Sequence, residues 1–337
     1  MGKYKLINNV LGWIVFAIAS TVYLMTMEPT ASFWDCGEFI SSAYKLEVGH
    51  PPGAPFFMLT ANLFTQLASD PSTVAKMVNT MSALFSGLTI LFLFWSITHL
   101  ARKIMVKDGE EASLGQMITV MGSGLVGALA YTFSDTFWFS AVEGEVYAYS
   151  SLFTAVVFWL ILKWEAVADK PHADRWIVLI AYLMGLSIGV HLLNLLCIPA
   201  IVLVYYYKKF PNPTMKGTLV ALLASFAIVA LMMYGVVQGL VEVCGYFELL
   251  FVNVLGMPYN SGVFAYVIIV AGVLIWSIWE TMRDEIHPTR MKIAFILSVV
   301  LIGIPFIGSG YVLAVILTAA LSLYLFKSKK VDIKTLN

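Results

Sequence analysis

The sequence predicts an all-α, polytopic membrane protein with about ten transmembrane helices and further helices lying in the membrane interface. Of its 337 residues, 60% are hydrophobic and only 12% are charged, whereas a soluble domain carries about 25% charged residues. Several apolar runs exceed about 18 residues, the length that a helix needs to cross a bilayer. We therefore expect one transmembrane domain over 1–337.

The distribution of charge predicts the orientation in the membrane. The first predicted span, 10–27, follows Lys3 and Lys5, and no small-residue cleavage site follows it, so we interpret it as a retained helix. On the predicted topology 18 of the 20 basic residues lie on one side, which the positive-inside rule makes cytoplasmic. Both termini are then cytoplasmic. The outer side is acidic, with Lys45 and Lys76 as its basic residues, which argues against a nucleic-acid partner and suits general-base chemistry or cation binding.

The first outer loop, 28–70, is long but not featureless. Segment 33–46 mixes aromatic residues with acids, as an interfacial helix does. The Pro51-Pro52-Gly53 turn ends it, because proline cannot continue a helix. Segment 54–68 is apolar but short, and we interpret it as a second interfacial helix, with a re-entrant segment as the alternative. A proline in the first turn then marks the start of the next helix, at Asp70-Pro71-Ser72.

The rest of the chain continues the membrane pattern. The apolar stretch 176–207 is too long for one span and begins and ends on the basic side, so it crosses twice, with its break near 189–191. An outer connection is expected over 239–262, and the last apolar stretch is a hairpin with Gly308-Ser309-Gly310 near its middle. The other predicted spans are 77–100, 116–133, 146–162, 218–238, 263–279 and the two arms of 293–326.

The first outer loop holds the main candidates for chemistry. Asp35 and Glu38 are three residues apart, so on a helix they share one face. Aromatic neighbours such as Trp34 desolvate carboxylates, and both desolvation and a second acid raise a carboxyl pKa towards the range of a general base. The alternative is an ordinary solvated acidic face. His50 could orient an acid, bind a phosphate, or simply cap the proline turn.

Two further groups lie at predicted helix ends. Glu143 and Glu145 precede the span 146–162, and helix N-termini favour negative charge, so they are either ordinary first-turn acids or part of a site. Tyr147 follows them and could line a sugar or lipid site. His191 and Asn194, at the tip of the hairpin, are either core polar residues or binding residues.

Several common catalytic motifs are absent from the sequence. It contains no glycine-rich nucleotide loop, no H-E-x-x-H and no G-x-S-x-G. The acids form no D-x-D pair. The sequence therefore does not suggest a nucleotide-sugar donor bound through a metal, and we predict no metal ligands.

Taken together, four motifs resemble a known family. They are W-D-C-G-E-F at 34–39, H-P-P-G-A-P at 50–55, E-G-E-V-Y at 143–147 and G-V-H-L-L-N-L-L at 189–196. The chain resembles bacterial membrane proteins of unknown function grouped as glycosyltransferase family 117. Their animal relatives are transmembrane protein O-mannosyltransferases, and the wider superfamily is GT-C. The resemblance covers roughly residues 1–210, and the rest matches by hydropathy.

The resemblance implies a GT-C-like membrane glycosyltransferase. It would transfer a sugar, mannose by analogy, from a polyprenyl-phosphate donor to a protein or glycan hydroxyl on the non-cytoplasmic side, with inversion by direct displacement. Asp35 matches the base that deprotonates the acceptor, and Glu38 matches its neighbouring acid. His50 would face the donor phosphate, and Glu143 and Glu145 match a second acidic motif.

The resemblance also implies a setting for the enzyme, which is a bacterial inner membrane. The resemblance implies that no cofactor is required, and it leaves open whether a divalent metal takes part. Membrane lipid is a partner, and further membrane or soluble subunits stay open because members of the family are longer than this chain.

Two other classes of function are the alternatives. A transporter or lipid flippase would use Glu143, His191 and Asn194 as a midplane site, and the third possibility is a non-catalytic membrane scaffold. Transporters usually place ionisable groups within their spans and show internal repeats. Here the acids cluster in outer loops, which favours the enzyme.

Overall fold

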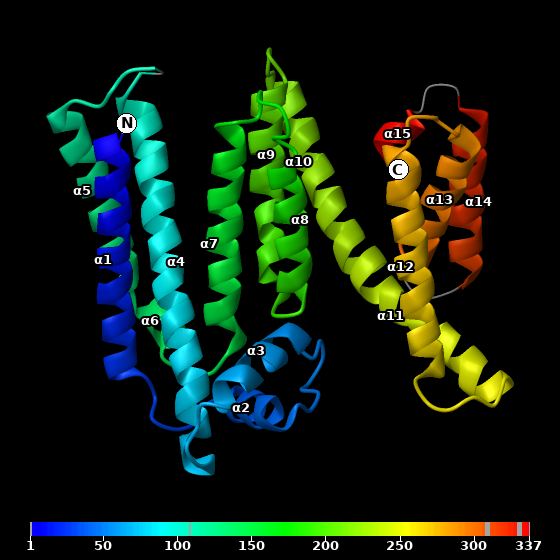
Figure 1. The fold of residues 1–337 in the computed structure, drawn as a ribbon, viewed down its shortest axis with the longest axis horizontal. Coiled ribbons are helices and arrows are strands. Elements are labelled where there is room, and N and C mark those ends of the chain that lie inside the picture. Colours follow the sequence, from blue (N-terminus) through cyan, green and yellow to red (C-terminus); the bar gives the residue numbers. More distant parts are fainter. Residues whose placement is uncertain (1, 108, 307–310, 329–331, 337) are drawn as a thin grey trace. The chain divides into compact units, whose positions relative to one another are not determined.

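The structure is a computed structural model, and it describes residues 2–107, 109–306, 311–328 and 332–336. Within these residues the chain forms helices and no strand, which confirms the all-α prediction (Figure 1). The helices divide into two compact units, 1–222 and 223–337, and each is described by itself. The expectation of one transmembrane domain stays a prediction.

Seven helical segments among the described residues are long and apolar enough to cross a membrane. Three apolar helices are shorter. The chain is therefore an integral membrane protein, and the count of ten spans stays a prediction. The seven are α1 (Gly2–Thr26), η1 with α4 (Pro71–Thr73 and Val74–Met105), α5 (Leu114–Thr132), α7 (Val146–Glu165), η2 with α9 (Leu192–Cys197 and Ile198–Lys209), the run Met215–Val254, and α12 (Ser261–Met282).

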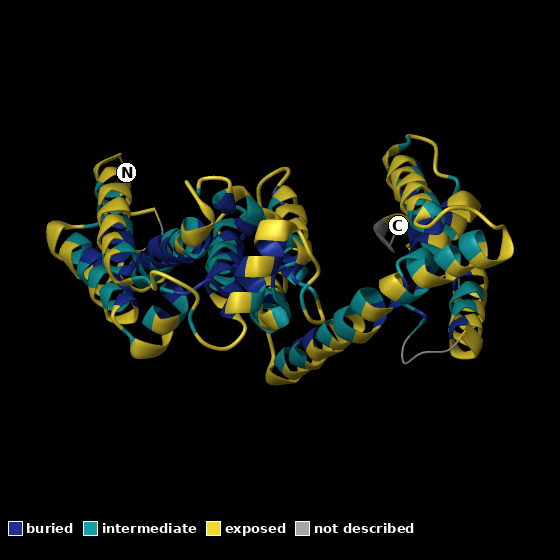
Figure 2. Ribbon diagram, turned by 90° about the horizontal axis from the view of Figure 1, so that it is seen from below, coloured by how far each residue is buried: buried dark blue, intermediate teal, exposed yellow. Residues whose placement is uncertain are grey.

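Helix α4 is the centre of the first unit, where it packs against α1, α5 and α7. Small residues allow close approach, as is usual between membrane helices. A Cβ atom at Gly87 of α4, for example, would collide with the Ser20 hydroxyl of α1. Exposed residues line the outer faces of the long helices, as expected for surfaces in contact with lipid (Figure 2).

A short helix, α6 (Asp135–Ala141), lies between the predicted spans 116–133 and 146–162. It buries Phe137 and Ala141 in the core that α1, α4 and α5 share. The indole Nε1 of Trp138 donates a hydrogen bond of 2.9 Å to Thr26 Oγ1, at the end of α1. Helix α6 therefore connects the ends of α1 and α5 at this side of the first unit.

The first outer loop contains the two expected helices, α2 (Cys36–Lys45) and α3 (Pro55–Thr65). Helix α2 is amphipathic, whereas α3 is apolar and also exposes Leu59 and Leu63. Both share one apolar core with α4 and α7, to which α2 contributes Phe39 and α3 contributes Phe57. They lie at the ends of the long helices and not between them (Figure 1). This placement favours the interfacial alternative for 54–68 over the re-entrant one.

The predicted break near 189–191 is confirmed, because α8 (Arg175–Ile188) ends there and η2 begins at Leu192. The Gly189 carbonyl accepts hydrogen bonds from the backbone N–H groups of Phe56, at 2.7 Å, and Phe57, at 3.2 Å. These N–H groups belong to the first turn of α3, where a helix has no internal acceptors. The break therefore holds the start of α3 in place.

The predicted outer connection over 239–262 is wrong for most of its length. α10 (Met215–Ala230) continues through a π-helical segment (Leu231–Val237), α11 (Gln238–Leu249) and a second π-helical segment (Leu250–Val254). The two acids in this stretch, Glu242 and Glu248, have hydrogen-bond partners. Glu242 accepts a hydrogen bond of 2.7 Å from the Tyr246 hydroxyl, one turn later, and Glu248 accepts the backbone N–H groups of Asn260 and Val263 at the start of α12.

The second unit also contains α13 (Pro288–Leu301), α14 (Tyr311–Lys327) and α15 (Ile333–Leu336). Helices α13 and α14 pack together as the predicted hairpin. The tip that we placed at Gly308-Ser309-Gly310 lies outside the described residues.

The contact between α1 and α4 is testable at Gly87. We expect Gly87→Ala to lower the free energy of unfolding by about 1–3 kcal/mol, because the added methyl group overpacks against Ser20. Gly122→Ala on α5 is the control, since its Cβ would have open space and alanine favours helix by up to about 1 kcal/mol. Thermal unfolding in detergent measures both variants, and equal effects at the two sites would contradict the predicted contact.

Candidate functional site

Four segments of the first unit surround one cavity of about 250 Å³. They are the start of α2, the turn between α2 and α3, the start of α7, and the break after α8. The lining residues are Asp35, Phe39, His50, Pro51, Pro52, Gly53, Ala54, Glu145, Val146, Tyr147, Val190 and His191. Five of our nine predicted site residues are therefore brought together here, namely Asp35, His50, Glu145, Tyr147 and His191.

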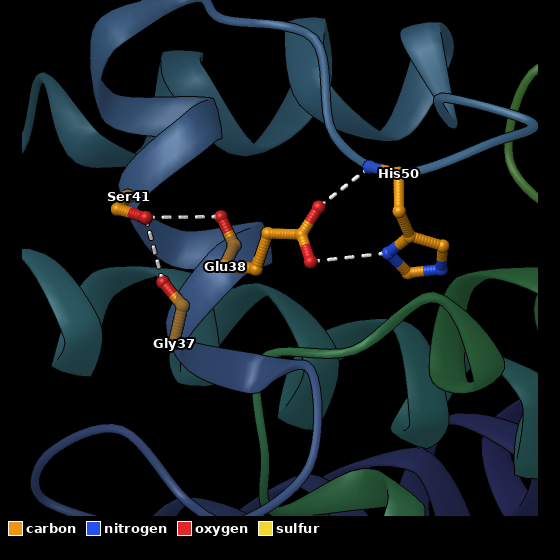
Figure 3. A network of polar contacts seen from close by, with 4 residues as sticks. All are labelled: Gly37, Glu38, Ser41 and His50. Carbon is orange, nitrogen blue, oxygen red and sulfur yellow. Dashed lines mark hydrogen bonds and ion pairs between the residues drawn. The ribbon is translucent and has the colours of Figure 1, made fainter.

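Glu38 is held by His50. Its carboxylate accepts the His50 backbone N–H at 2.5 Å and lies 3.1 Å from His50 Nδ1 (Figure 3). These hydrogen bonds stabilise the charged form, so they lower the pKa of Glu38. Asp35, at the N-cap of α2, is exposed and lines the cavity. Of the two predicted catalytic acids, Asp35 is thus the one that lines the cavity, and Glu38 anchors the turn.

The turn at His50 is compact. The Gly53 N–H donates to the His50 carbonyl at 2.8 Å, and the Pro51-Pro52 bond is cis. The His50 ring lies against Phe39, with 5.6 Å between the ring centroids. The imidazole is therefore fixed on one side by an aromatic ring and on the other by a carboxylate, and it is positioned as a wall of the cavity.

Glu143 and Glu145 are buried, with only 3% and 6% of their surfaces exposed. Burial raises the pKa of both carboxyl groups. For Glu145, burial comes first and the negative charges of Glu143 and Asp35 add to it, so its pKa rises to about 7. Neither residue is a first-turn acid of α7, because the helix begins at Val146 and Glu145, its N-cap residue, makes no side-chain capping hydrogen bond.

Tight packing holds the segment 143–145, the acidic turn, in position. A Cβ atom at Gly144 would lie 2.9 Å from Asn79 Oδ1 of α4 and 3.1 Å from Ile40 of α2, so glycine permits this approach. The Asn79 Nδ2 group donates to the carbonyls of Glu28, at 2.6 Å, and Thr30, at 3.0 Å. The end of α1, the acidic turn and α4 are therefore connected through one asparagine.

His191 and Tyr147 also line the cavity, with 5.4 Å between their ring centroids. His191 Nδ1 accepts the Leu193 backbone N–H at 3.1 Å, so in the neutral ring the proton is on Nε2. Burial lowers the pKa of His191, which favours this neutral form. His191 can therefore offer an Nε2–H donor to a ligand.

The other predicted binding residues lie elsewhere. Asn194 is buried and donates a hydrogen bond of 2.8 Å to Ser187 Oγ, so it is a core polar residue. Trp34 is 86% exposed and does not line the cavity. Glu143 is buried and does not line the cavity, and its carboxylate accepts hydrogen bonds from the side chains of Ser32 and Cys36.

The sequence reasoning missed three residues that support the site. Ser32 and Cys36 bond to Glu143, and Asn79 holds the loop from a distant helix. Burial and the nearby carboxylates raise the pKa of Cys36 to about 12, so its thiol is not a nucleophile at neutral pH. Cys36 could have been identified from its position inside the W-D-C-G-E-F motif. No sequence motif surrounds Asn79, so the sequence offered no reason to select it.

Three residues at this site could hold a metal ion. Asp35, Glu38 and His50 each offer one ligand atom, and these atoms lie within 4.8 Å of one another. Two carboxylates and an imidazole suit a divalent cation such as Mn²⁺ or Zn²⁺. In this structure, however, the Glu38 carboxylate is already occupied by two hydrogen bonds from His50.

Comparison with known proteins identifies similar sequences over the region of the cavity. A family model described as the protein O-mannosyl-transferase TMEM260 N-terminal domain matches residues 35–214. The chain is 28% identical over 174 residues to mouse protein O-mannosyl-transferase TMEM260, and 25% identical over 187 residues to the Dictyostelium discoideum protein of that name. These matches cover 52% and 54% of this chain but 22% and 21% of the relatives. No solved structure matches.

The raised pKa of Glu145 makes stability depend on pH. The ordinary pKa is 4.5 and the folded value is about 7, so between these values the folded protein holds a proton that the unfolded chain releases. Stability therefore falls as pH rises from about 4.5 to about 7. We expect Glu145→Gln to be more stable than the native protein by about 1–3 kcal/mol at pH 8, and nearly equal to it near pH 4.5. Thermal unfolding at both pH values tests this, and a pH-independent difference would contradict it.

Proposed function

Because the chain belongs to the family of the protein O-mannosyl-transferase TMEM260 N-terminal domain, we propose that it is a GT-C-type membrane mannosyltransferase. The donor is a polyprenyl-phosphate mannose, and the acceptor is a hydroxyl group of a protein or glycan. The chain spans about a fifth of the length of the relatives it matches. The proposal therefore concerns the chemistry of this cavity and not the whole activity of those relatives.

The observation that carries the proposal is the convergence of two carboxylates and two histidines on one cavity. Asp35 and Glu145 lie on its acidic wall, and His50 and His191 lie beside them. Hydrolases and transferases use a carboxylate as general base. Such a group must lie within hydrogen-bond distance of the proton that it removes, and it must also have a suitable pKa. Asp35 is the exposed member of the pair, so an acceptor hydroxyl can reach it.

The reaction that we propose is a single displacement. The acceptor oxygen attacks the anomeric carbon of the sugar while Asp35 takes the hydroxyl proton. The bond between this carbon and the phosphate oxygen breaks, and the lipid phosphate leaves with the electron pair. The sugar configuration inverts, and no covalent intermediate with the protein forms.

The two histidines suit the phosphate end of the donor. The neutral His191 ring carries a donor at Nε2, and His50 is held in place by Glu38. Hydrogen bonds to the departing phosphate oxygens stabilise charge that grows as the bond breaks. A lipid-borne donor also suits the place of α2 and α3 at the ends of the long helices (Figure 1).

We propose that this end faces the non-cytoplasmic side. Helix α1 begins at the opposite end of the first unit, next to Lys3 and Lys5, and it leads to the loop that holds Asp35 (Figure 1). Positive residues favour the cytoplasm. The cavity then opens where lipid-linked donors and secreted acceptors meet.

The transporter alternative requires Glu143, His191 and Asn194 to share one site. Of these three, the cavity wall includes His191, whereas Glu143 and Asn194 are buried among protein partners. No observation favours transport over the enzyme.

Replacing the proposed base tests the mechanism. We expect Asp35→Asn to reduce mannose transfer by about 10²- to 10⁴-fold, because the amide cannot accept the hydroxyl proton. The assay follows transfer from polyprenyl-phosphate mannose to a serine- and threonine-containing peptide by mass spectrometry. Glu47→Gln is the matched control, since Glu47 is an exposed acid of the same loop that does not line the cavity. Unchanged transfer by Asp35→Asn would rule out Asp35 as the base.

Removal of divalent metal is a second test. We expect transfer to persist in EDTA at about the native rate, because the proposed displacement relies on Asp35 and the histidines and not on a Lewis acid. The measurement is the initial rate before and after chelation. A large loss that Mn²⁺ or Mg²⁺ restores would instead assign Asp35, Glu38 and His50 as metal ligands.

A further inference from the structure

A second and larger cavity lies at the other end of the first unit, where the N-terminus is found (Figure 1). Its volume is about 510 Å³. The start of α1, the end of α4 and the end of α7 form its walls. It is separate from the acidic cavity, which the start of α2 and the turn between α2 and α3 help to form, and the proposed sugar transfer makes no use of it.

The walls of this cavity are basic. Lys5, His99, Arg102 and Lys163 line it, and no carboxylate does. The carboxylate of Glu165 is nearby, but it pairs with Lys103, at 2.5 Å from Lys103 Nζ. The cations of the cavity therefore repel one another, and this energy is relieved when an anion enters.

Aromatic side chains fix the positions of the cations. The Lys163 ammonium lies 4.8 Å from the ring centroid of Trp159, and the Arg102 guanidinium lies 5.0 Å from that of Tyr4. Fixed cations lose little conformational entropy when a ligand binds, which favours affinity. The cavity is thus organised before any ligand arrives.

Some polar atoms of the lining residues are buried without a partner. They include the Arg102 Nε–H group, which can only donate, and His99 Nε2. A buried donor without an acceptor costs free energy, so such atoms are normally paired. An anion with several acceptor oxygens would satisfy them.

The positive-inside rule explains why lysine and arginine occur at this end of the helices. This rule does not explain why some of these side chains are half-buried between helices. Side chains that serve only this rule extend to water, as Lys107 does. Here the half-buried Arg102 and Lys163 line a hollow between three helices.

We propose that this cavity binds a phosphate-bearing anion. Phosphate offers several acceptor oxygens on one charged centre, which suits a guanidinium beside two ammonium groups. Basic pockets between membrane helices commonly hold lipid head groups. The phosphate comes either from the head group of an anionic phospholipid or from a soluble phosphate ester.

Two measurements on the 337-residue chain distinguish these sources. In lipid nanodiscs, native mass spectrometry compares retention of phosphatidylglycerol with that of phosphatidylcholine. In detergent, thermal unfolding is followed against inorganic phosphate at constant ionic strength. Preferential retention of phosphatidylglycerol assigns a head group, and stabilisation by inorganic phosphate assigns a soluble ester. Either result, if it depends on the cavity, supports the proposal.

Variants test that dependence. Arg102→Gln with Lys163→Gln should weaken binding by about 100-fold, since a hydrogen bond to a charged group contributes about tenfold or more in affinity. Lys5→Gln should weaken binding about tenfold. Because Lys5 is exposed, this variant replaces the double variant in the test if the double variant fails to fold. Lys107→Gln is the control for Lys5→Gln, because it removes the same charge at the same end of the helices from a residue that does not line the cavity. The proposal is overturned if neither source binds, or if Lys107→Gln weakens binding as much as Lys5→Gln does.

Discussion

The burial of two carboxylates beneath the first outer loop is the constraint on which the candidate site depends. Glu143 and Glu145 are almost fully covered, and their burial is unfavourable for the charged forms. The fold compensates with hydrogen bonds from Ser32, Cys36 and the Asp35 backbone. The short loop at Gly144, packed against α4 and α2, permits this arrangement. The hydrogen bond from the Asp35 backbone links Glu145 to the start of α2, where Asp35 lines the cavity.

The two cavities of the first unit differ in the charge of the residues that line them. One end holds Asp35, Glu145, the proline turn and two histidines around a cavity of about 250 Å³. The other holds lysines, an arginine and tryptophans around a cavity of about 510 Å³. Helices α1, α4 and α7 connect the two ends.

Much of the fold could be predicted from local patterns. The helix break near Gly189, the helix start at Asp70-Pro71 and the two helices of the first outer loop all match the sequence reasoning. The prediction failed over 239–254, where we expected a connection that carries Glu242 and Glu248 and the structure has a continuous helix. Their carboxylates find hydrogen-bond donors on Tyr246 and at the start of α12, and such pairing depends on contacts that a hydropathy pattern does not contain.

The sequence by itself determined the membrane character of the protein, the ends of most helices and the presence of acids in the 28–70 loop and before α7, because these follow from composition and local backbone preference. Only the tertiary structure decided which acids share a cavity. It placed Asp35 beside Glu145, tied Glu38 to His50, and left Trp34 and Asn194 outside. The physical reason is that desolvation and hydrogen bonding act between side chains that are far apart in the chain and meet only when the helices pack.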